Sequence, residues 1–374
     1  MSPYEAVLAL EDGSKFYGSG FGAPAEVSGE VVFNTGMVGY LEALTDASYA
    51  GQILVQTYPL VGNYGVPSKV RRDAFGFPCH LESERVQVAG YVVHSPSRHP
   101  SHRTSDGTLG RWLREQNVPA ISGIDTRRLT KKLRTRGVML GILKVDEEID
   151  ADELDDKIRG IPDPSRMDLV RGVTIEEPII HRGSGPRIVL IDCGVKLGIV
   201  RSLLARGATV IRVPYTYPAD GILDFDPSGV VISNGPGEPK MCVETIGVVG
   251  ELLETDLPLM GICLGNQLLA LAAGGDTYKL KFGHRGQNHP CVDLSDGRCY
   301  ITSQNHGFAV DAESLGDTGF EASFINANDG TNEGIRHRSK PVFGVQFHPE
   351  GSPGPLDAEF LFDEFLKEAR GCCA

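Results

Sequence analysis

Apolar strands and helices alternate regularly after Pro186, and this alternation constrains the fold more than any other feature of the sequence. The first run, RIVLID (187–192), is continuously apolar, which is typical of a strand buried on both faces. TVIRV and GVVIS are later strands of this kind, and LGIVRSLLARG has helical spacing with a stop signal at Gly207. A helix within CVETIGVVGELLET, the strand LPLMGI and a helix within GNQLLALAAGG follow. The pattern predicts an open, doubly wound α/β sheet whose ligand site lies beyond the carboxyl ends of the strands.

The part of the chain before this alternation has a different character. It carries β-branched residues between glycine turns, which predicts strands, and one helix is expected over Thr126–Thr135. Asp125 would cap the start of this helix, and Gly137 lies shortly after its end. The length of 374 residues suits two domains. We expect a strand-rich domain over 1–145, a surface helix and linker over 146–186, and the α/β domain over 187–374.

The composition argues against several kinds of binding partner and against disulfide and metal sites. A formal net charge of −13 provides no general attraction to nucleic acid or to an anionic membrane, so neither is expected as a partner. No apolar run is long enough to span a bilayer, and the first residues lack a secretory signal, so a cytoplasmic location is expected. The eight cysteines are scattered and form no CxxC pairs of zinc-ligand spacing, so no disulfide framework or metal site is expected. Cys372 and Cys373 are interpreted as exposed thiols without a role.

The segment LPLMGICLGNQLLALA contains the first candidate for chemistry, Cys263. An apolar strand ends here at G-x-C-x-G and a helix begins at once, so Gly261 and Gly265 would allow a sharp turn that lifts the thiol out of the sheet. A helix N-terminus favours the thiolate, and the N–H of Leu264 would point at a developing oxyanion. Taken alone, the segment would equally suit a small buried cysteine.

The segment PVFGVQFHPE (341–350) supplies a base and a group to orient it. Two residues apart in an extended chain, His348 and Glu350 lie on the same side, so the carboxylate can hold the imidazole while the imidazole serves a thiol. Alone, this tripeptide at a strand end would better suit a surface histidine. Two weaker segments follow. In VVISNGPGEP (230–239), Gly235 and Gly237 form a turn that could bring backbone N–H groups to a substrate. In ITSQNHGFAV (301–310), Asn305, His306 and Gly307 are interpreted as a bend between two strands.

Taken together, NGPGEP, GICLGNQ, SQNHGFAV and FHPEGSPGP closely resemble a class I (triad) glutamine amidotransferase domain. The resemblance implies Cys263 as the nucleophile toward the side-chain amide of L-glutamine, His348 as general base and acid, and Glu350 as the residue that orients His348. It also implies an oxyanion hole and a glutamine pocket formed by Gly235, Gly237, Leu264, Gln267, Asn305, Gly307 and Phe308. Asn266, Gln287 and Gly351 depart from the pattern most associated with the family, which bears on pocket shape and not on the reaction.

The first domain is also similar to a known one. LEDGSKFYGSGFG, the stretch from GEVVFNTG to GNYGV and ISGIDTRRLTKKLRTRG look like the N-terminal domain of carbamoyl-phosphate synthetase small subunits, so the resemblance covers nearly the whole chain. It implies that Ser48, in the TDxSY segment, contacts the substrate glutamine. It further implies a large-subunit partner that uses the ammonia with bicarbonate and two ATP to make carbamoyl phosphate. Because the chain has no G-x-x-x-x-G-K-[ST] loop, no cofactor is expected here, and ATP and magnesium are expected on the large subunit.

Two other functions remain open on the sequence. One is the amidotransferase subunit of another synthetase, of the anthranilate or GMP type, against which the first domain argues. The other is a non-catalytic α/β module with a regulatory role, against which the intact Cys, His and Glu set argues. Residues 68–87 and 146–180 carry no chemistry that the sequence identifies.

Overall fold

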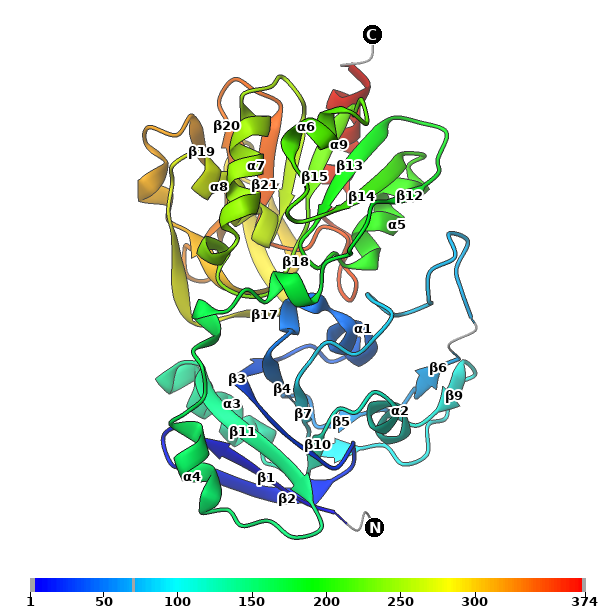
Figure 1. The fold of residues 1–374 in the computed structure, drawn as a ribbon, viewed down its shortest axis with the longest axis vertical. Coiled ribbons are helices and arrows are strands. Elements are labelled where there is room, and N and C mark those ends of the chain that lie inside the picture. Colours follow the sequence, from blue (N-terminus) through cyan, green and yellow to red (C-terminus); the bar gives the residue numbers. More distant parts are fainter. Residues whose placement is uncertain (1–3, 69–70, 372–374) are drawn as a thin grey trace. The chain divides into compact units, whose positions relative to one another are not determined.

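The computed structural model describes residues 4–68 and 71–371, so Cys372 and Cys373 lie outside the described part. The chain divides into two compact units, Met1–Pro164 and Ser165–Ala374. This division falls inside the range 146–186 where the sequence indicated a linker. Unit 1 is drawn in blue to green and unit 2 in green to red in Figure 1.

Unit 1 is built on a closed β-barrel (Figure 1). Parallel pairs join β3 to β4, β4 to β7 and β7 to β10, and the other neighbours are antiparallel. In their order around the barrel, the strands are β1 (Glu5–Leu10), β11 (Met139–Asp146), β3 (Ala25–Asn34), β4 (Gln52–Gln56), β7 (Gly90–Val92), β10 (Ala120–Ser122) and β2 (Lys15–Gly20). Two small sheets pair β5 (Leu60–Val61) with β8 (Ser95–Pro96) and β6 (Val66–Pro67) with β9 (Ser105–Gly107).

The single helix expected in this unit forms with the expected caps. It is α3 (Thr126–Arg136), and the Asp125 side chain accepts a hydrogen bond from the N–H of Arg128 at 2.9 Å. Gly137 ends the helix with a φ of 108°, a conformation that favours glycine. The prediction of only one helix is wrong, because α1 (Tyr40–Thr45) and α2 (Leu109–Glu115) are also present. Both are so short that apolar spacing gives little helical signal.

The charged segment after the barrel folds back onto it. It forms α4 (Glu153–Ile158), whose Leu154 and Ile158 are four residues apart and therefore share one helix face. These two side chains are buried against Val7 of β1 and Ile142 of β11. Lys157 on the same helix pairs with Glu26 at 2.9 Å. The helix is thus part of the packing of unit 1.

Unit 2 has the predicted doubly wound α/β fold. Its sheet runs in the order β12, β14, β13, β15, β16, β21, β20, β19, β17, β18, and the strands from β14 to β21 are parallel. The strands are β12 (Ile179–His181), β13 (Arg187–Asp192), β14 (Thr209–Pro214), β15 (Gly229–Ile232), β16 (Leu259–Ile262), β17 (Thr277–Asp293), β18 (Cys299–Val310), β19 (Phe320–Asn326), β20 (Asn332–His337) and β21 (Val342–Val345). The helices are α5 (Leu197–Ala205), α6 (Ala219–Leu223), α7 (Val243–Leu253), α8 (Leu264–Ala272) and α9 (Phe360–Gly371).

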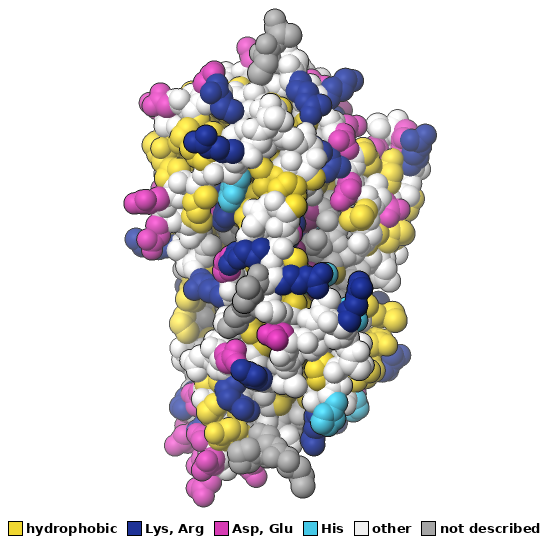
Figure 2. Space-filling view, turned by 90° about the vertical axis from the view of Figure 1, so that its right-hand side faces the viewer, with side chains coloured by type: hydrophobic (Ala, Val, Ile, Leu, Met, Phe, Trp, Pro, Cys, Tyr) yellow, Lys and Arg dark blue, Asp and Glu magenta, His cyan; other side chains and the backbone are white. Residues whose placement is uncertain are grey.

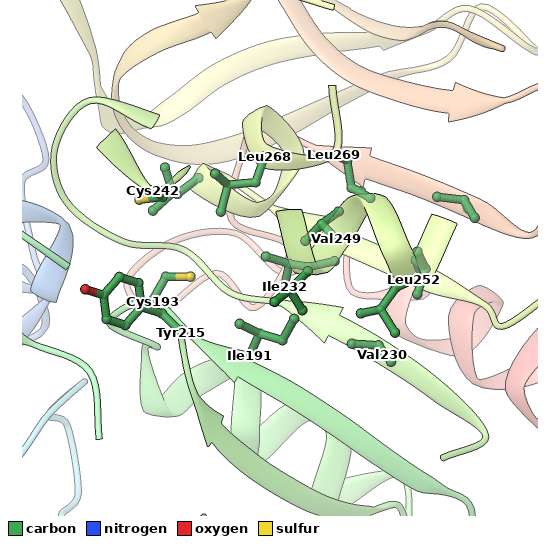
Figure 3. Packing of buried hydrophobic residues seen from close by; sticks show 14 of the residues in the cluster. Ile191, Cys193, Tyr215, Val230, Ile232, Cys242, Val249, Leu252, Leu268 and Leu269 are labelled. Atoms are coloured by element: carbon green, nitrogen blue, oxygen red, sulfur yellow. The ribbon is translucent and has the colours of Figure 1, made fainter. Parts of the chain in front are cut away.

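The core of unit 2 lies between the sheet and its helices. Figure 3 shows Ile191 and Ile232 of the strands facing Val249 of α7 and Leu268 of α8. Alternate residues of each strand point to the opposite face, where Phe365 of α9 lies against Gly229. Both faces of the parallel strands are therefore covered, which explains their continuously apolar sequences.

The interpretation of Asn305, His306 and Gly307 as a bend between two strands is wrong. They lie within the continuous strand β18, which pairs with β17 through His284 and His306 and again through Lys279 and Phe308. The register shifts between these two pairs because β17 has extra residues there, so the irregularity belongs to β17. The prediction failed because Asn305, His306 and Gly307 are residue types that are common in turns.

Positive and negative charges are mixed on the face drawn in Figure 2, where Lys and Arg side chains are scattered among Asp and Glu side chains. Among the described residues, no helix combines the length and the apolar character needed to cross a bilayer.

The Asp125 cap yields a prediction about the stability of unit 1. We expect Asp125→Ala to lower the free energy of unfolding of this unit by about 0.5–2 kcal/mol, because the first turn of α3 loses a hydrogen-bond acceptor. The single tryptophan of the chain, Trp112, is buried in unit 1, so its fluorescence during urea denaturation reports on this unit. Asp125→Asn is the matched control and should retain most of the stability, whereas equal loss in both variants would contradict a capping role.

Candidate active site

Two motifs that are far apart in sequence meet at one edge of the sheet in unit 2. Cys263 follows β16, and the segment that contains His348 follows the neighbouring strand β21. These strands are parallel, Ile262 pairs with Val345, and the N–H of Cys263 donates to the carbonyl of Val345 at 2.8 Å. Parallel pairing therefore brings both segments to the carboxyl edge, where such folds bind ligands.

The turn at Cys263 has the sharp geometry that its glycines predicted. Cys263 has φ 55° and ψ −102°, a conformation that side-chain-bearing residues rarely adopt, and it directly precedes α8. A Cβ on Gly265 would overlap the carbonyl oxygen of Ile232, so only glycine fits the start of this helix. The Sγ of Cys263 lies 3.6 Å from the carbonyl oxygen of Asn305 and 3.6 Å from Nε2 of Gln346. The thiol is thus placed at a helix N-terminus and in contact with the neighbouring strands.

His348 and Glu350 form the buried pair that their spacing predicted, so the alternative of a surface histidine is wrong. His348 Nδ1 lies 2.7 Å from Glu350 Oε1, and both side chains are almost fully buried. Since a carboxylate can only accept, Nδ1 carries the proton, and in the neutral ring Nε2 carries the lone pair. Within the described part of the chain, Nε2 is buried without a hydrogen-bond partner. This nitrogen is therefore available to take a proton.

Lys196 is a site residue that the sequence did not indicate. Its Nζ lies 2.7 Å from Glu350 Oε1, with both side chains buried. Burial alone would raise the pKa of Glu350, but the ammonium of Lys196 and the ring of His348 lower it to about 2. Glu350 is consequently a carboxylate at neutral pH. The only sequence signal for Lys196 was its place in the short turn that follows the apolar strand RIVLID (187–192).

A polar turn after β13 presents Lys196 to the site. The carboxylate of Asp192 accepts hydrogen bonds from the N–H groups of Gly194 at 2.9 Å and Val195 at 2.8 Å. The N–H of Lys196 then donates to Oδ1 of Asn234, in the loop after β15, at 3.0 Å. The loops of two neighbouring strands are therefore tied together next to Glu350.

Two of the residues expected to bind glutamine, Gly235 and Gln267, lie at the start of α8, close to Cys263 in the fold. A Cβ on Gly235 would overlap the carbonyl oxygen of Cys193 and lie 2.7 Å from the side chain of Leu264, so Gly235 packs against the start of α8. Gln267 is buried, and its Nε2 donates to the carbonyl oxygen of Phe308 at 2.9 Å. Gln267 Nε2 also donates to Gln346 at 3.1 Å, another residue that the sequence did not indicate.

The remaining expected pocket residues have these positions. Asn305 is buried on β18 with its carbonyl at Cys263, and Gly307 and Phe308 follow it, half-buried, on the same strand. Gly237 has a φ of 90° and lies near the side chain of Leu169. Ser48 belongs to unit 1, where it is buried in a 3₁₀ turn and its N–H donates to Asp46 Oδ1 at 2.9 Å.

The ion pair of Lys196 and Glu350 yields a prediction about stability and pH. We expect Lys196→Met to destabilise unit 2 by about 3–5 kcal/mol at pH 7, because the Glu350 carboxylate is left buried without its cation. The folded-state pKa of Glu350 is below its ordinary value, so its stabilising effect is present above that value and is lost as the pH falls toward 2.

Without Lys196 the pKa of Glu350 rises. The difference in unfolding free energy between Lys196→Met and the unaltered chain should therefore become smaller in acid. Far-UV circular dichroism during urea denaturation at several pH values would measure it. Adding Glu350→Gln to Lys196→Met should recover part of the loss. A deficit that does not change with pH would show that Lys196 stabilises the unit through packing and not through charge.

Both halves of the chain match known families. Residues 8–143 match the family described as carbamoyl-phosphate synthase small chain, CPSase domain. Residues 189–368 match glutamine amidotransferase class-I.

Similarity to individual proteins extends over nearly the whole chain. The carbamoyl phosphate synthase small chain of Methanopyrus kandleri is 52% identical over 368 residues, covering 98% of this chain and 99% of that protein. The corresponding protein of Methanocaldococcus jannaschii is 52% identical over 97% of this chain and 98% of its own length. The carbamoyl phosphate synthase arginine-specific small chain of Chaetomium globosum is 48% identical over 99% of this chain and 79% of its own length. The chain therefore belongs to the carbamoyl-phosphate synthase small chain family and carries a class I glutamine amidotransferase domain, as its motifs indicated.

Proposed function

We propose that this chain is the glutamine-hydrolysing subunit of a carbamoyl-phosphate synthase, a ligase, and that Cys263, His348 and Glu350 are its catalytic residues. The observation that carries this proposal is the buried pair of His348 and Glu350, 2.7 Å apart, at the end of the strand next to the Cys263 turn. Family membership supplies the substrate, L-glutamine, and the geometry at Cys263 supports the roles.

The reaction proceeds through a thioester. His348 Nε2 takes the proton of the Cys263 thiol, and the sulfur attacks the side-chain amide carbon of glutamine. The N–H groups of Gly235 and Leu264 stabilise the oxyanion. His348 returns the proton to the amide nitrogen, the C–N bond breaks and ammonia leaves. Water, deprotonated by His348, then attacks the thioester, which releases glutamate and restores the thiol.

Glu350 and Lys196 act through His348. The Glu350 carboxylate holds the proton on Nδ1 and thereby keeps Nε2 as the acceptor, and it stabilises the imidazolium that forms during the reaction. Burial raises the pKa of Glu350, but Lys196 and the ring of His348 together lower it to about 2, so Lys196 helps to keep Glu350 charged. Gly237, Gln267, Asn305, Gly307 and Phe308 line the glutamine pocket in this proposal.

The ammonia is delivered to a large-subunit partner, which makes carbamoyl phosphate from bicarbonate and two ATP. ATP and magnesium bind to that partner, and this chain requires no cofactor for glutamine hydrolysis. The product supplies arginine and pyrimidine biosynthesis. The complex is cytoplasmic and does not bind nucleic acid or membranes. Co-purification and mass determination would identify the partner, which should be roughly a thousand residues long.

The match of residues 8–143 to the carbamoyl-phosphate synthase small chain family argues against a subunit of an anthranilate or GMP synthetase. The buried His348 and Glu350 pair argues against a non-catalytic regulatory module, because buried titratable groups are costly without a use.

The thioester mechanism predicts separable activities. We expect Cys263→Ala to reduce glutamine-dependent carbamoyl phosphate formation by about 10³-fold or more while leaving synthesis from added ammonium unchanged, because ammonia enters after the thioester step. Both rates would be measured on the assembled complex. Cys242→Ala, which removes another buried thiol of unit 2, is the control and should retain both activities. Equal loss of both activities in an assembled Cys263→Ala complex would contradict a separate glutaminase site.

On the family resemblance, Ser48 of unit 1 also contacts the substrate. Losing one neutral hydrogen bond costs about 0.5–1.5 kcal/mol, so Ser48→Ala should raise KM for glutamine by about 2- to 12-fold and change kcat much less. Steady-state glutaminase kinetics would measure both constants. Ser122→Ala, in a strand of the same unit, is the matched control and should leave KM unchanged. An unchanged KM in Ser48→Ala would remove Ser48 from the site, and a collapse of kcat alone would assign it to catalysis.

A further inference from the structure

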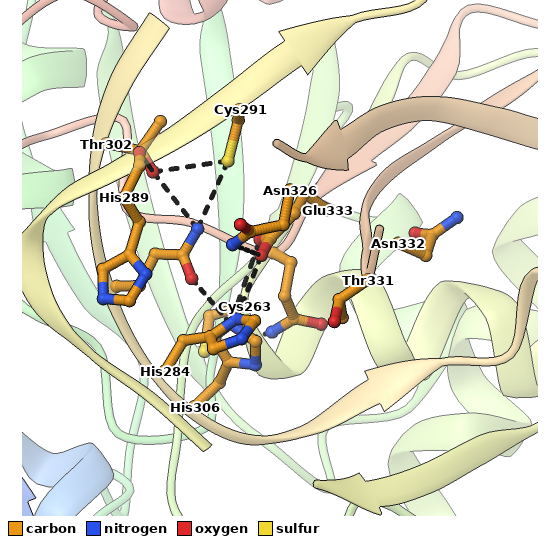
Figure 4. A network of polar contacts seen from close by, with 12 residues as sticks. Cys263, His284, His289, Cys291, Thr302, His306, Asn326, Thr331, Asn332 and Glu333 are labelled. Carbon is orange, nitrogen blue, oxygen red and sulfur yellow. Dashed lines mark hydrogen bonds and ion pairs between the residues drawn. The ribbon is translucent and has the colours of Figure 1, made fainter. Parts of the chain in front are cut away.

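Three buried side chains with metal-ligating atoms, one each from β17, β18 and β20, converge in unit 2. They are His284, His306 and Glu333, and their nearest ligand atoms all lie within 4.8 Å of one another. Side-chain exposure is 7% for His284, 1% for His306 and 0% for Glu333. Figure 4 shows both imidazoles beside the Glu333 carboxylate. The glutaminase mechanism uses none of these side chains.

The hydrogen bonds of His306 direct a lone pair into the cluster. Its Nδ1 lies 2.8 Å from the carbonyl oxygen of Phe308, which can only accept, so Nδ1 carries a proton. In the neutral ring, Nε2 then carries a lone pair and no proton. Nε2 nevertheless lies 3.1 Å from Gln304 Oε1 and 3.9 Å from Glu333 Oε2, both of which are acceptors.

The orientation of the Gln304 amide is held by its other contacts. Its Nε2 donates to Thr302 Oγ1 at 3.2 Å, and Thr302 Oγ1 in turn donates to the carbonyl oxygen of His289 at 2.9 Å. Thr302 has no second hydroxyl proton to offer a reversed amide. Gln304 Nε2 also donates to Cys291 Sγ at 3.3 Å, so the amide group has two acceptors on this side in its present orientation.

His284 has the hydrogen-bond arrangement of a metal-bound histidine. Its Nε2 lies 2.8 Å from Asp329 Oδ2, outside the cluster, and its Nδ1 faces Glu333 Oε1 at 3.2 Å. Histidine ligands commonly donate one ring N–H to a carboxylate or a backbone carbonyl and bind the metal with the other nitrogen. Asp329 would serve His284 in this way, and the carbonyl of Phe308 serves His306.

Glu333 is left incompletely satisfied. Its Oε1 accepts a hydrogen bond from Asn326 Nδ2 at 2.9 Å. Its Oε2 is buried and, within the described part of the chain, has no hydrogen-bond partner. A buried carboxylate oxygen without a donor is costly, and here it faces two further acceptors.

We propose that His284 Nδ1, His306 Nε2 and the Glu333 carboxylate bind one Zn²⁺ ion, with Gln304 Oε1 as a fourth donor. Two imidazoles and a carboxylate suit zinc, and a single cation would satisfy all the converging acceptors. Zinc holds such ligands at about 2.0–2.2 Å, which in a tetrahedral site places the ligand atoms about 3.3–3.6 Å apart. The 3.2 Å contact of His284 with Glu333 already has about this length, and only the wider separations, which are at most 4.8 Å, would have to shorten. Because the ligands are buried, the site is structural and not catalytic.

The alternative to a zinc ion in this cluster is a second proton on His284. Burial lowers the pKa of His284, but the Glu333 and Asp329 carboxylates outweigh this effect and raise it. Such a proton would satisfy the contact of His284 with Glu333 Oε1. It would leave His306 Nε2, Gln304 Oε1 and Glu333 Oε2 facing one another unless a further proton were bound on His306 or Glu333, whereas one metal ion would serve all three.

The zinc ion would stabilise the position of β18, the strand whose Asn305 contacts Cys263. His306 directly follows Asn305, whose carbonyl oxygen lies 3.6 Å from Cys263 Sγ. Cross-linking β17, β18 and β20 at this point would fix the position of β18. The proposal concerns these strands and does not depend on the glutaminase mechanism.

Metal binding to the full-length, tag-free chain tests this proposal. Cys263→Ala serves as the background, so that zinc bound to the candidate nucleophile is not counted. After removal of metal with EDTA, we expect the chain to bind one equivalent of Zn²⁺ in competition with a chromophoric chelator. X-ray absorption should show imidazole and oxygen ligands without sulfur, although Cys291 lies nearby, 3.4 Å from Thr302. Zinc should raise the melting temperature of unit 2.

Variants separate a metal from a proton. We expect Glu333→Gln to abolish stoichiometric binding and Asp329→Asn to weaken zinc by about 10–100-fold, since outer partners of ligands have effects of this size. The Asp329 side chain is 45% exposed, so Asp329→Asn should fold even if Glu333→Gln does not. His289→Gln, on the same strand as His284, is the matched control and should retain zinc. Three outcomes would overturn the proposal. They are a lack of stoichiometric zinc binding, sulfur ligands in the X-ray absorption spectrum, and equal zinc affinity in Asp329→Asn and the background chain.

Discussion

The parallel pairing of β16 with β21 is the constraint on which the candidate site depends. Because Ile262 lies opposite Val345, the residues that follow the two strands begin at the same level of the sheet edge. A shift of one residue in this register would displace the His348 segment by about 3.3 Å along the strand and turn every side chain of β21 to the opposite face of the sheet. The apolar core on both faces, which makes such a shift costly, therefore also determines the alignment of the site.

Above this apolar sheet lies a polar layer that is almost fully connected. Asp192 shapes the loop that carries Lys196, Lys196 pairs with Glu350, and Glu350 holds His348. Each member is buried, so each depends on the next for its charge or its hydrogen bonds. The result is a row of linked polar groups that ends at His348 Nε2, which has no hydrogen-bond partner in the described part of the chain.

The parts of this arrangement that were predictable from the sequence depend on local backbone chemistry. Alternating apolar runs indicated the doubly wound sheet, and glycines beside Cys263 indicated its turn. Lys196 and Gln346 were missed because their roles arise from contacts between segments far apart in the chain. Residues 301–310 have turn-like composition but form a strand, since pairing with β17 outweighs their local preference. The cluster of His284, His306 and Glu333 has no recognisable spacing, because its members come from three separate strands.

The left-handed backbone of Cys263 has a consequence for how the protein can evolve. A residue with a side chain in such a conformation costs on the order of 1–3 kcal/mol, which the surrounding packing must offset. Selection for a durable fold alone would favour glycine at this position, which adopts the conformation without strain. A thiol is retained there only while selection acts on what the thiol does. A descendant chain that no longer needed the reaction would be free to gain stability at the very residue that defines its chemistry.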